Sequence, residues 1–311
     1  MVQYIVSMTE QGAHKHVLDR ELRKAELKEI IDEMYPILVD IVDESSWVLR
    51  EAFTRYDGNR ENLAIPLLCH SQFEMLDAMS ELCKEAIYLP AYLQLRSIQE
   101  SHYYSRFLDK SGDLFQRRAI AYVYEYHRQY MVLGRRLESI KGEDSDWIEK
   151  HLEELAEKGF KETIDEHKRA KKENGNRSCQ WYSLFNGPAN FTDLTKEVLA
   201  HIPEGADGSA EANSIMYGMY SQGMHANDHY MRISSNNDGT AEIKSFRTFN
   251  KINDFVVCYG LAARMTLFSV SILLQRNCTN SFKRGVDLWI NNFQPRLQKL
   301  ERFTPEEEVN E

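Results

Sequence analysis

This chain of 311 residues contains few turn-forming residues and few cysteines, and its net charge is negative. Seven prolines and fifteen glycines are too few for an all-β protein with many tight turns. Long amphipathic runs rich in Leu, Glu, Lys, Ala and Met indicate helices instead. We therefore predict an all-α protein, and the chain is long enough to bury a substantial core.

The five cysteines are odd in number and widely spaced, and no two of them form a CxxC pair. This pattern fits free thiols in a reducing compartment better than a disulfide framework or a zinc knuckle. The N-terminus has a short apolar start but neither a basic leader nor a long apolar region, so we expect no secretory signal. These features predict a cytoplasmic protein.

The formal net charge of −10 and the isoelectric point near 5.6 describe an acidic chain. Such a charge repels polyanions at long range, which argues against a protein that coats nucleic acids. A small basic site for a single phosphate is still compatible with it, because local charge can differ from the total.

One segment, Phe255–Leu274, is apolar and about long enough to cross a membrane. Arg264 stands at its middle, where a charge costs roughly 2.5–3.5 kcal/mol on insertion scales. We therefore expect a buried central helix here rather than a membrane span, and no membrane partner.

Apolar residues spaced by three and four predict a series of helices along the chain. A first long helix is expected over His16–Tyr56, with Pro36 as a candidate break. Asn62 is the expected cap of the second helix, and Thr192 or Asp193 the cap of a later short one. The remaining helices are predicted over Leu63–Tyr88, Pro90–Lys110, Leu114–Ile140, Glu143–Glu173, Thr192–His201, Ala210–Tyr230, Asn253–Arg276 and Ser281–Leu300.

We predict that these helices form one bundle-like domain with a single small β-hairpin near residues 232–246. Residues 1–60 are expected to form a long helix packed on the core, residues 61–302 the helical core, and residues 303–311 a disordered acidic tail. More than half of the residues in Glu143–Glu173 are charged, with a thin apolar edge. That helix is either an arm or dimer contact, or a solvated peripheral helix.

The stretch Met216–Tyr230 carries the most distinctive polar pattern. Tyr217, Ser221 and His225 recur at every fourth residue, so a helix places them on one stripe. A nucleophilic Ser221 is disfavoured, because the G-x-S-x-G elbow of serine hydrolases is absent. His225 suits either acid–base chemistry or a simple hydrogen bond.

The same stretch contains His225, Asp228 and His229, and two histidines at i and i+4 can chelate a metal. No HExxH acid and no other strong ligand cluster accompanies them, so we expect neither a metal nor a cofactor.

Arg96 and Glu100 stand four residues apart within the apolar segment Pro90–Arg106. Because buried polar groups need partners, we predict that this segment and Met216–Tyr230 face each other across one pocket. Arg96 then either presents its fork to a phosphate or carboxylate, or forms a purely structural pair with Glu100.

Arg96 and His102 also read R-x5-H, which resembles the R-x(4–6)-H motif of HEPN ribonucleases. The resemblance implies a composite site in a dimer, where the histidine acts as acid–base and the arginine offsets phosphate charge. Two features depart from it: Ser97 replaces the usual Asn, Asp or His, and the two side chains point roughly 120° apart on a straight helix.

A broader resemblance spans roughly residues 65–275. The block Leu95–Glu100, the charged helix, the loop around Trp181 and the Y-x-x-Y-S-x-x-x-H segment from Tyr217 to His225 occur in this order. The order is similar to that of a bacterial family, domain of unknown function 5677. This likeness implies a helical cytosolic protein with a polar pocket and no established reaction, and its members resemble HEPN-type proteins of bacterial defence and toxin modules.

Two functions are compatible with these patterns. The first is a HEPN-like RNA-processing or antiphage defence effector, a metal-independent endoribonuclease that uses Arg96, Glu100, His102, Ser221 and His225. The second is a non-enzymatic sensor or interaction module that binds a small anionic or nucleotide-like ligand. In either case the expected partners are a second copy of the chain and RNA or a small anion, with a protein of a defence module as a further candidate.

Overall fold

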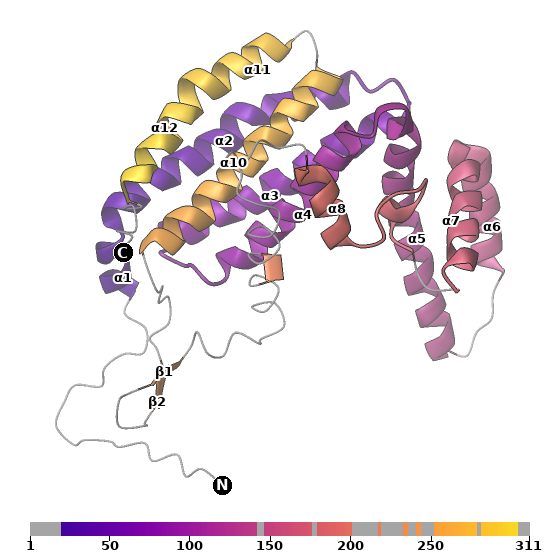
Figure 1. Cartoon of the computed structure of the whole chain (residues 1–311), viewed down its shortest axis with the longest axis horizontal. Helices are drawn as coiled ribbons and strands as arrows, with labels where there is room; N and C mark the ends of the chain where they lie inside the picture. Colours follow the sequence, from indigo (N-terminus) through magenta and orange to yellow (C-terminus); the bar gives the residue numbers. More distant parts are fainter. Residues whose placement is uncertain are drawn as a thin grey trace.

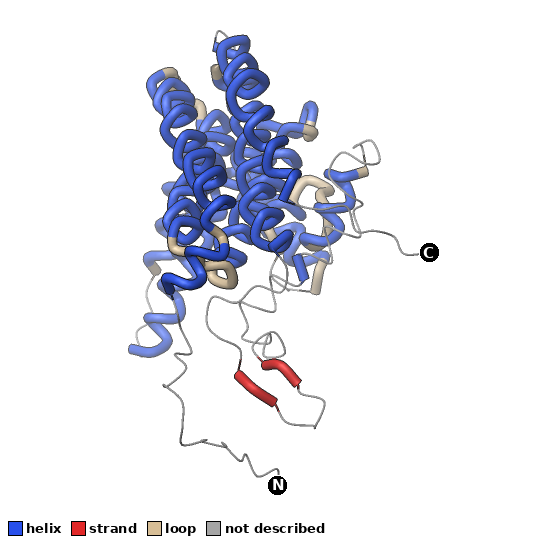
Figure 2. Tube along the Cα trace, turned by 90° about the vertical axis from the view of Figure 1, so that its left-hand side faces the viewer, coloured by secondary structure: helices blue, strands red, loops and turns tan. Residues whose placement is uncertain are grey.

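The computed structural model describes residues 20–141, 146–175, 179–200, 217–218, 233–235, 241–243, 252–278 and 281–303, and these are mainly helical (Figures 1 and 2). The prediction of an all-α protein is therefore confirmed. The helices are α1 (Arg20–Glu26), α2 (Lys28–Thr54), α3 (Ala64–Lys84), α4 (Ala91–Asp109), α5 (Phe115–Lys141), α6 (Trp147–Leu155), α7 (Lys161–Glu173), α8 (Phe191–Leu199), α10 (Ile252–Asn277), α11 (Phe282–Leu288) and α12 (Gln294–Lys299).

Two short strands lie within the segment where the sequence predicts a hairpin. β1 (Ile233–Ser235) and β2 (Ala241–Ile243) pair antiparallel, with Ile233 opposite Ile243. Both views place the pair outside the assembly of long helices (Figures 1 and 2).

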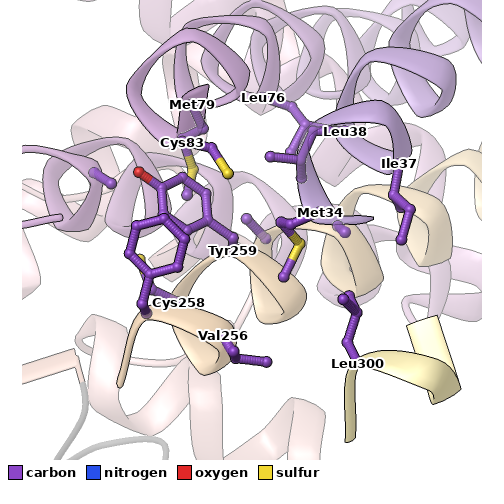
Figure 3. Packing of buried hydrophobic residues seen from close by; sticks show 14 of the residues in the cluster. Met34, Ile37, Leu38, Leu76, Met79, Cys83, Val256, Cys258, Tyr259 and Leu300 are labelled. Carbon is purple, nitrogen blue, oxygen red and sulfur yellow. The ribbon is translucent and has the colours of Figure 1, made fainter. Parts of the chain in front are cut away.

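Four long helices, α2, α3, α4 and α10, form the centre of the molecule, where they pack against one another (Figure 1). Their apolar residues recur every three or four positions, so each helix turns a continuous apolar stripe inward. At one end of the bundle Met34, Leu38, Leu76, Met79 and Tyr259 are fully buried together (Figure 3). Burying one such aliphatic side chain contributes roughly 1.5–3 kcal/mol.

A second apolar cluster occupies the other end of the same helices. Val48 of α2, Leu68 of α3, Phe107 of α4 and Leu273 of α10 meet there, together with Trp181 from the loop before α8. This cluster joins α8 and its preceding loop to the bundle, and it thereby fixes the surroundings of the middle of α4.

The charged segment predicted as one helix forms two helices, α6 and α7. Gly159 between them has a φ of 90°, a left-handed conformation that glycine adopts without a Cβ clash. Ile148, Phe160 and Ile164 of this pair pack against Tyr124 and Met131 of α5. The narrow apolar edge expected from the sequence therefore contacts α5.

Four other local predictions differ from the structure. α2 continues through Pro36, since burial of the flanking Met34 and Leu38 offsets the missing backbone donor, and the interruption falls at Leu27 instead. Neither Thr192 nor Asp193 caps α8.

Asn190 is the cap of α8, because its side chain accepts a hydrogen bond of 3.0 Å from the Asp193 backbone N–H. Asn62 lies in a 3₁₀ turn, Arg60–Leu63, and donates to Asp57 rather than capping α3. The predicted last helix divides into α11 and α12 at a π turn, Trp289–Phe293.

α10 is long and apolar enough to cross a membrane by length and composition, and 67% of its most apolar window is buried inside the structure. It lies among α2, α3 and α4, in the central position that the sequence predicts for it. Arg264 points away from this core: its side chain is 52% exposed and pairs with Glu301 at 3.0 Å.

All five cysteines are buried, and none forms a disulfide. Burial raises the pKa of the Cys69 and Cys83 thiols, which keeps them protonated and unreactive at neutral pH. These cysteines therefore act as small apolar core residues.

Candidate functional site

The middle of α4 carries a charged pair on a helix that is otherwise held by apolar packing. Leu95 and Ile98 are fully buried in the core, and this fixes the rotation of α4 about its axis. The Nε of Arg96 donates to Glu100 Oε1 at 3.1 Å, and the two side chains are 17% and 32% exposed. The predicted i,i+4 pair is thus present and partly buried.

Tyr217 joins this pair from a part of the sequence more than a hundred residues away. The Nη2 of Arg96 donates to the Tyr217 hydroxyl at 2.8 Å, and that hydroxyl donates to Glu100 Oε1 at 2.7 Å. The guanidinium also lies over the Tyr217 ring, 4.8 Å from its centroid. We call these three residues the Arg96 triad.

The charges of the triad are mutually balanced. Burial lowers the pKa of Arg96, but the hydrogen bonds and charges of Tyr217 and Glu100 raise it above its ordinary value. Burial, followed by the hydrogen bond and charge of Glu100, raises the pKa of Tyr217 to about 12. Tyr217 therefore stays protonated, which allows it to accept from Arg96 while it donates to Glu100.

Among the described residues, both hydrogen bonds that Glu100 accepts end on the same oxygen, Oε1. A carboxylate accepts on both of its oxygens, so Oε2 can accept a hydrogen bond from a ligand. The half-buried guanidinium of Arg96 supplies the cationic group beside it. A ligand with one donor group and one anionic group matches this arrangement.

An aromatic cluster continues from Tyr217 into the protein. The ring of Phe191 lies 4.7 Å from that of Tyr217, and Phe191 in turn contacts Tyr104 at 5.8 Å. Tyr104 stacks on Tyr182 at 5.8 Å and meets Trp181 edge-on at 5.2 Å. The site is therefore a charged triad bordered by aromatic rings.

The negative charge of Glu100 affects two more tyrosines of this cluster. Burial, and next the charge of Glu100, raises the pKa of both Tyr104 and Tyr182. Their hydroxyls consequently remain neutral donors near the triad.

Unusual backbone geometry holds the loop that contributes Trp181 and Tyr182. Phe185 and Asn186 both have φ near +57°, and the Phe185 N–H donates to the Glu166 carboxylate of α7 at 2.8 Å. At Gly187 a Cβ atom would lie only 1.8 Å from the Tyr182 carbonyl oxygen. Only glycine fits there, so the sequence Asn186-Gly187 fixes the path of the aromatic loop.

His102 lies on a different side of α4 from the triad. It is 3% exposed, its ring contacts Phe268 of α10, and its Nδ1 lies 3.2 Å from the Ser269 hydroxyl. That hydroxyl also donates to the Met265 carbonyl, so it can accept from His102 in the tautomer that carries its proton on Nδ1. Burial, and next the charge of Arg106, lowers the pKa of His102 to about 3, so the imidazole is neutral at physiological pH.

Of the predicted site residues, the structure brings Arg96 and Glu100 together and separates His102 from them. Ser221 and His225 lie outside the described residues, as do Asp228 and His229. Within the described ranges, no group of three or more His, Cys, Asp or Glu side chains is arranged to hold a metal.

The sequence prediction does not include Tyr217 or the aromatic cluster among the site residues. For Tyr217 the signal is present, since it begins the four-residue stripe that continues to Ser221 and His225. For the aromatic cluster the only signal in the sequence is the pair Trp181-Tyr182. This pair does not indicate which residues it contacts, because those contacts depend on how α4 and α8 pack.

A separate apolar cavity of about 310 Å³ lies between α2, α10 and the region of α11. Trp47, Leu267, Leu274 and Trp289 are among the residues that line it. It shares no lining residue with the Arg96 triad, so it is a different feature of the molecule.

Comparison with known proteins adds a family but no activity. No curated protein and no solved structure matches the chain. A family described as "Family of unknown function (DUF5677)" matches residues 61–240, which contain the Arg96 triad, the charged helices and the aromatic loop. Because this match covers more than half of the 311 residues, the chain belongs to that family of unknown function.

Proposed function

We propose that this protein is a non-enzymatic sensor or interaction module that binds a small nucleotide-like ligand at the Arg96 triad. The observation that carries the proposal is the hydrogen-bonded arrangement of Arg96, Glu100 and Tyr217, which joins two distant parts of the chain. Because these hydrogen bonds orient the three side chains before a ligand arrives, binding costs less side-chain entropy.

Each residue of the triad can contact a chemical group that nucleotides carry. Arg96 can offer its guanidinium to a phosphate, and Glu100 Oε2 can accept from an amino group or a hydroxyl. Tyr217 and Phe191, whose rings are 4.7 Å apart, supply apolar surface next to these groups, and the Arg96 guanidinium lies over the Tyr217 ring. A simple inorganic anion uses only the first of these contacts and should bind more weakly.

The ribonuclease hypothesis is the alternative, and the geometry favours it less. It requires His102 to reach RNA together with Arg96, whereas His102 contacts Ser269 and Phe268 inside the protein. His225, the other acid–base candidate, lies outside the described residues. We therefore keep a role in RNA processing or antiphage defence as the alternative function.

The test is thermal unfolding of the purified full chain with a panel of nucleoside mono-, di- and triphosphates. A ligand at a hundredfold excess over its Kd stabilises the folded state by about 2.7 kcal/mol. That stabilisation corresponds to a rise of about 4 °C in the Tm of a protein of this size. We expect one class of nucleotide to give such a rise and inorganic phosphate to give less.

Arg96→Ala should abolish this rise, and Tyr217→Phe should reduce it while keeping the ring. The matched control is Arg128→Ala, because Arg128 forms a similarly buried i,i+3 pair with Glu125 on α5. Equal Tm shifts in the Arg96→Ala and Arg128→Ala proteins would refute the assignment of the ligand to the triad.

A further inference from the structure

Helix α5 exposes five large apolar side chains along its outer surface. Tyr126, Tyr130, Leu133, Leu137 and Ile140 are 74%, 56%, 57%, 58% and 82% exposed, respectively. Each is thus more than half accessible to solvent. We call this set the α5 stripe.

The stripe residues follow one another at intervals of four, three, four and three residues. This alternation is the spacing of the seam in a left-handed coiled coil, and over fourteen residues it extends about 21 Å along a helix. Exposed apolar residues scattered at random over a surface have no such order. The spacing therefore points to a second helix as the complementary surface.

The face of α5 that holds α6 and α7 is a different one. Tyr124 and Met131 form that face, where they are buried against Ile148, Phe160 and Ile164. Of the stripe residues, Tyr130 reaches the edge of α6, with its ring 5.6 Å from that of Trp147. Figure 1 shows the C-terminal end of α5 reaching beyond the neighbouring helices α6 and α7.

The area of the stripe is large for the surface of a monomer. A fully buried tyrosine covers about 150–250 Å², so the exposed parts of Tyr126 and Tyr130 alone amount to roughly 200–300 Å². The three aliphatic side chains add to this, whereas the largest apolar patch of a typical monomer is about 300–600 Å² and is often functional.

At the e and g positions, which flank the seam of a coiled coil, the charged residues of this stretch are positive, whereas Glu125 and Glu138 lie outside these positions. Arg136 precedes Leu137, and Lys141 follows Ile140. Among the described residues neither of them forms an ion pair, whereas Arg128, about two turns before Arg136, pairs with Glu125 at 2.5 Å. Acidic side chains on a partner could form ion pairs with both Arg136 and Lys141.

The same charges argue against a second copy of α5 as the partner in a parallel pair. In a parallel coiled coil the position of Arg136 faces a position five residues later on the other helix. That position is Lys141, so two copies would place like charges together. A helix with Asp or Glu at these flanking positions avoids the repulsion.

We propose that the α5 stripe docks an amphipathic helix of another protein, with apolar residues at alternating three- and four-residue intervals and acidic residues beside them. The proposal rests on the α5 stripe and its flanking charges, and it is independent of the ligand proposed for the Arg96 triad.

The experiment uses the full chain and two synthetic helical peptides, measured by fluorescence anisotropy. Both peptides have leucine at the seam positions, and the flanking positions are glutamate in one and lysine in the other. We expect the acidic peptide to bind, more weakly as salt is raised, and the basic peptide to bind at least tenfold more weakly.

The double variant Leu133→Glu, Leu137→Glu should weaken binding of the acidic peptide at least tenfold. Leu67→Glu is the control, because Leu67 is a surface residue of α3 that is 40% exposed. Arg136→Glu leaves the apolar seam intact and should shift the preference toward the basic peptide. Circular dichroism of each variant should show unchanged helix content.

Three results would overturn the proposal. Equal binding of the two peptides would show that charge does not select the partner. Unchanged binding of the acidic peptide by the double variant would show that the α5 stripe is not the binding surface. A wild-type dimer in light scattering that the double variant converts to a monomer would assign the stripe to self-association.

Discussion

Buried His102 should make the stability of this protein depend on pH in a way that one substitution can isolate. Its folded-state pKa is lowered to about 3, because burial and the charge of Arg106 both disfavour the imidazolium, whereas an unfolded chain has a histidine pKa near 6.5. Below pH 6.5 the unfolded state therefore binds a proton that the folded state does not. Stability is lost as the pH falls.

The size of the effect follows from proton linkage. Each pH unit below 6.5 costs about 1.4 kcal/mol per histidine kept neutral, so the change from pH 7.5 to pH 5.0 costs about 2 kcal/mol. His102→Asn removes the titrating group, and its amide can still donate to Ser269. The variant starts from a lower stability because a ring is replaced, but it should lose about 2 kcal/mol less than the wild type between the two pH values.

Urea unfolding of both proteins at the two pH values measures this difference. Other histidines, including His127 and His167, are common to both proteins and cancel in the comparison. A parallel loss of stability in the wild type and in His102→Asn, or an NMR titration of His102 near pH 6.5, would refute the buried neutral state. Either result would also make His102 a candidate acid–base group for RNA cleavage.

Three further predictions concern the core, the aromatic loop and the alternative function. Leu38→Ala should reduce the free energy of unfolding by about 2–5 kcal/mol, measured by denaturant unfolding, because Leu38 is fully buried. Gly187→Ala should cost about 1–3 kcal/mol and change the near-UV circular dichroism, because its Cβ would overlap the Tyr182 carbonyl. RNA incubated with the purified protein should remain intact on a denaturing gel, and cleavage that is lost in Arg96→Ala and His102→Ala would favour the ribonuclease alternative.

Each of the two stability predictions has a control in the same chain. Leu67→Ala removes the same atoms as Leu38→Ala from a 40% exposed position and should cost roughly 1 kcal/mol, because only part of this side chain is buried. Gly260→Ala adds a methyl in a helix where no atom lies within 4 Å of the new Cβ, and it should be neutral or stabilising by up to about 1 kcal/mol. Equal losses in a variant and its control would contradict the packing argument.

Much of the helical order is readable from the sequence because apolar spacing reports which face of a helix is buried. Ile30, Met34, Ile37 and Leu38 show that spacing, and all of them are buried in α2. Proline is weaker evidence: Pro36 removes one hydrogen bond, and the burial of the surrounding residues outweighs it. The division of the charged helix at Gly159 is harder to foresee, since an isolated glycine is tolerated within many helices.

The pairing within the site is predictable for a different reason, and only in part. A charged pair on a largely buried helix needs partners, so Arg96 and Glu100 predict a polar group from elsewhere, and Tyr217 supplies it. The aromatic cluster has no comparable requirement, because the rings of Phe191, Tyr104 and Tyr182 can pack against any apolar surface. Tyr104 follows Glu100 by one turn of α4, but Tyr182 and Phe191 reach it through the loop at Gly187 and the start of α8, whose positions depend on tertiary packing. Sequence therefore identifies the groups that need a partner, whereas the groups that merely fit are found only in the folded chain.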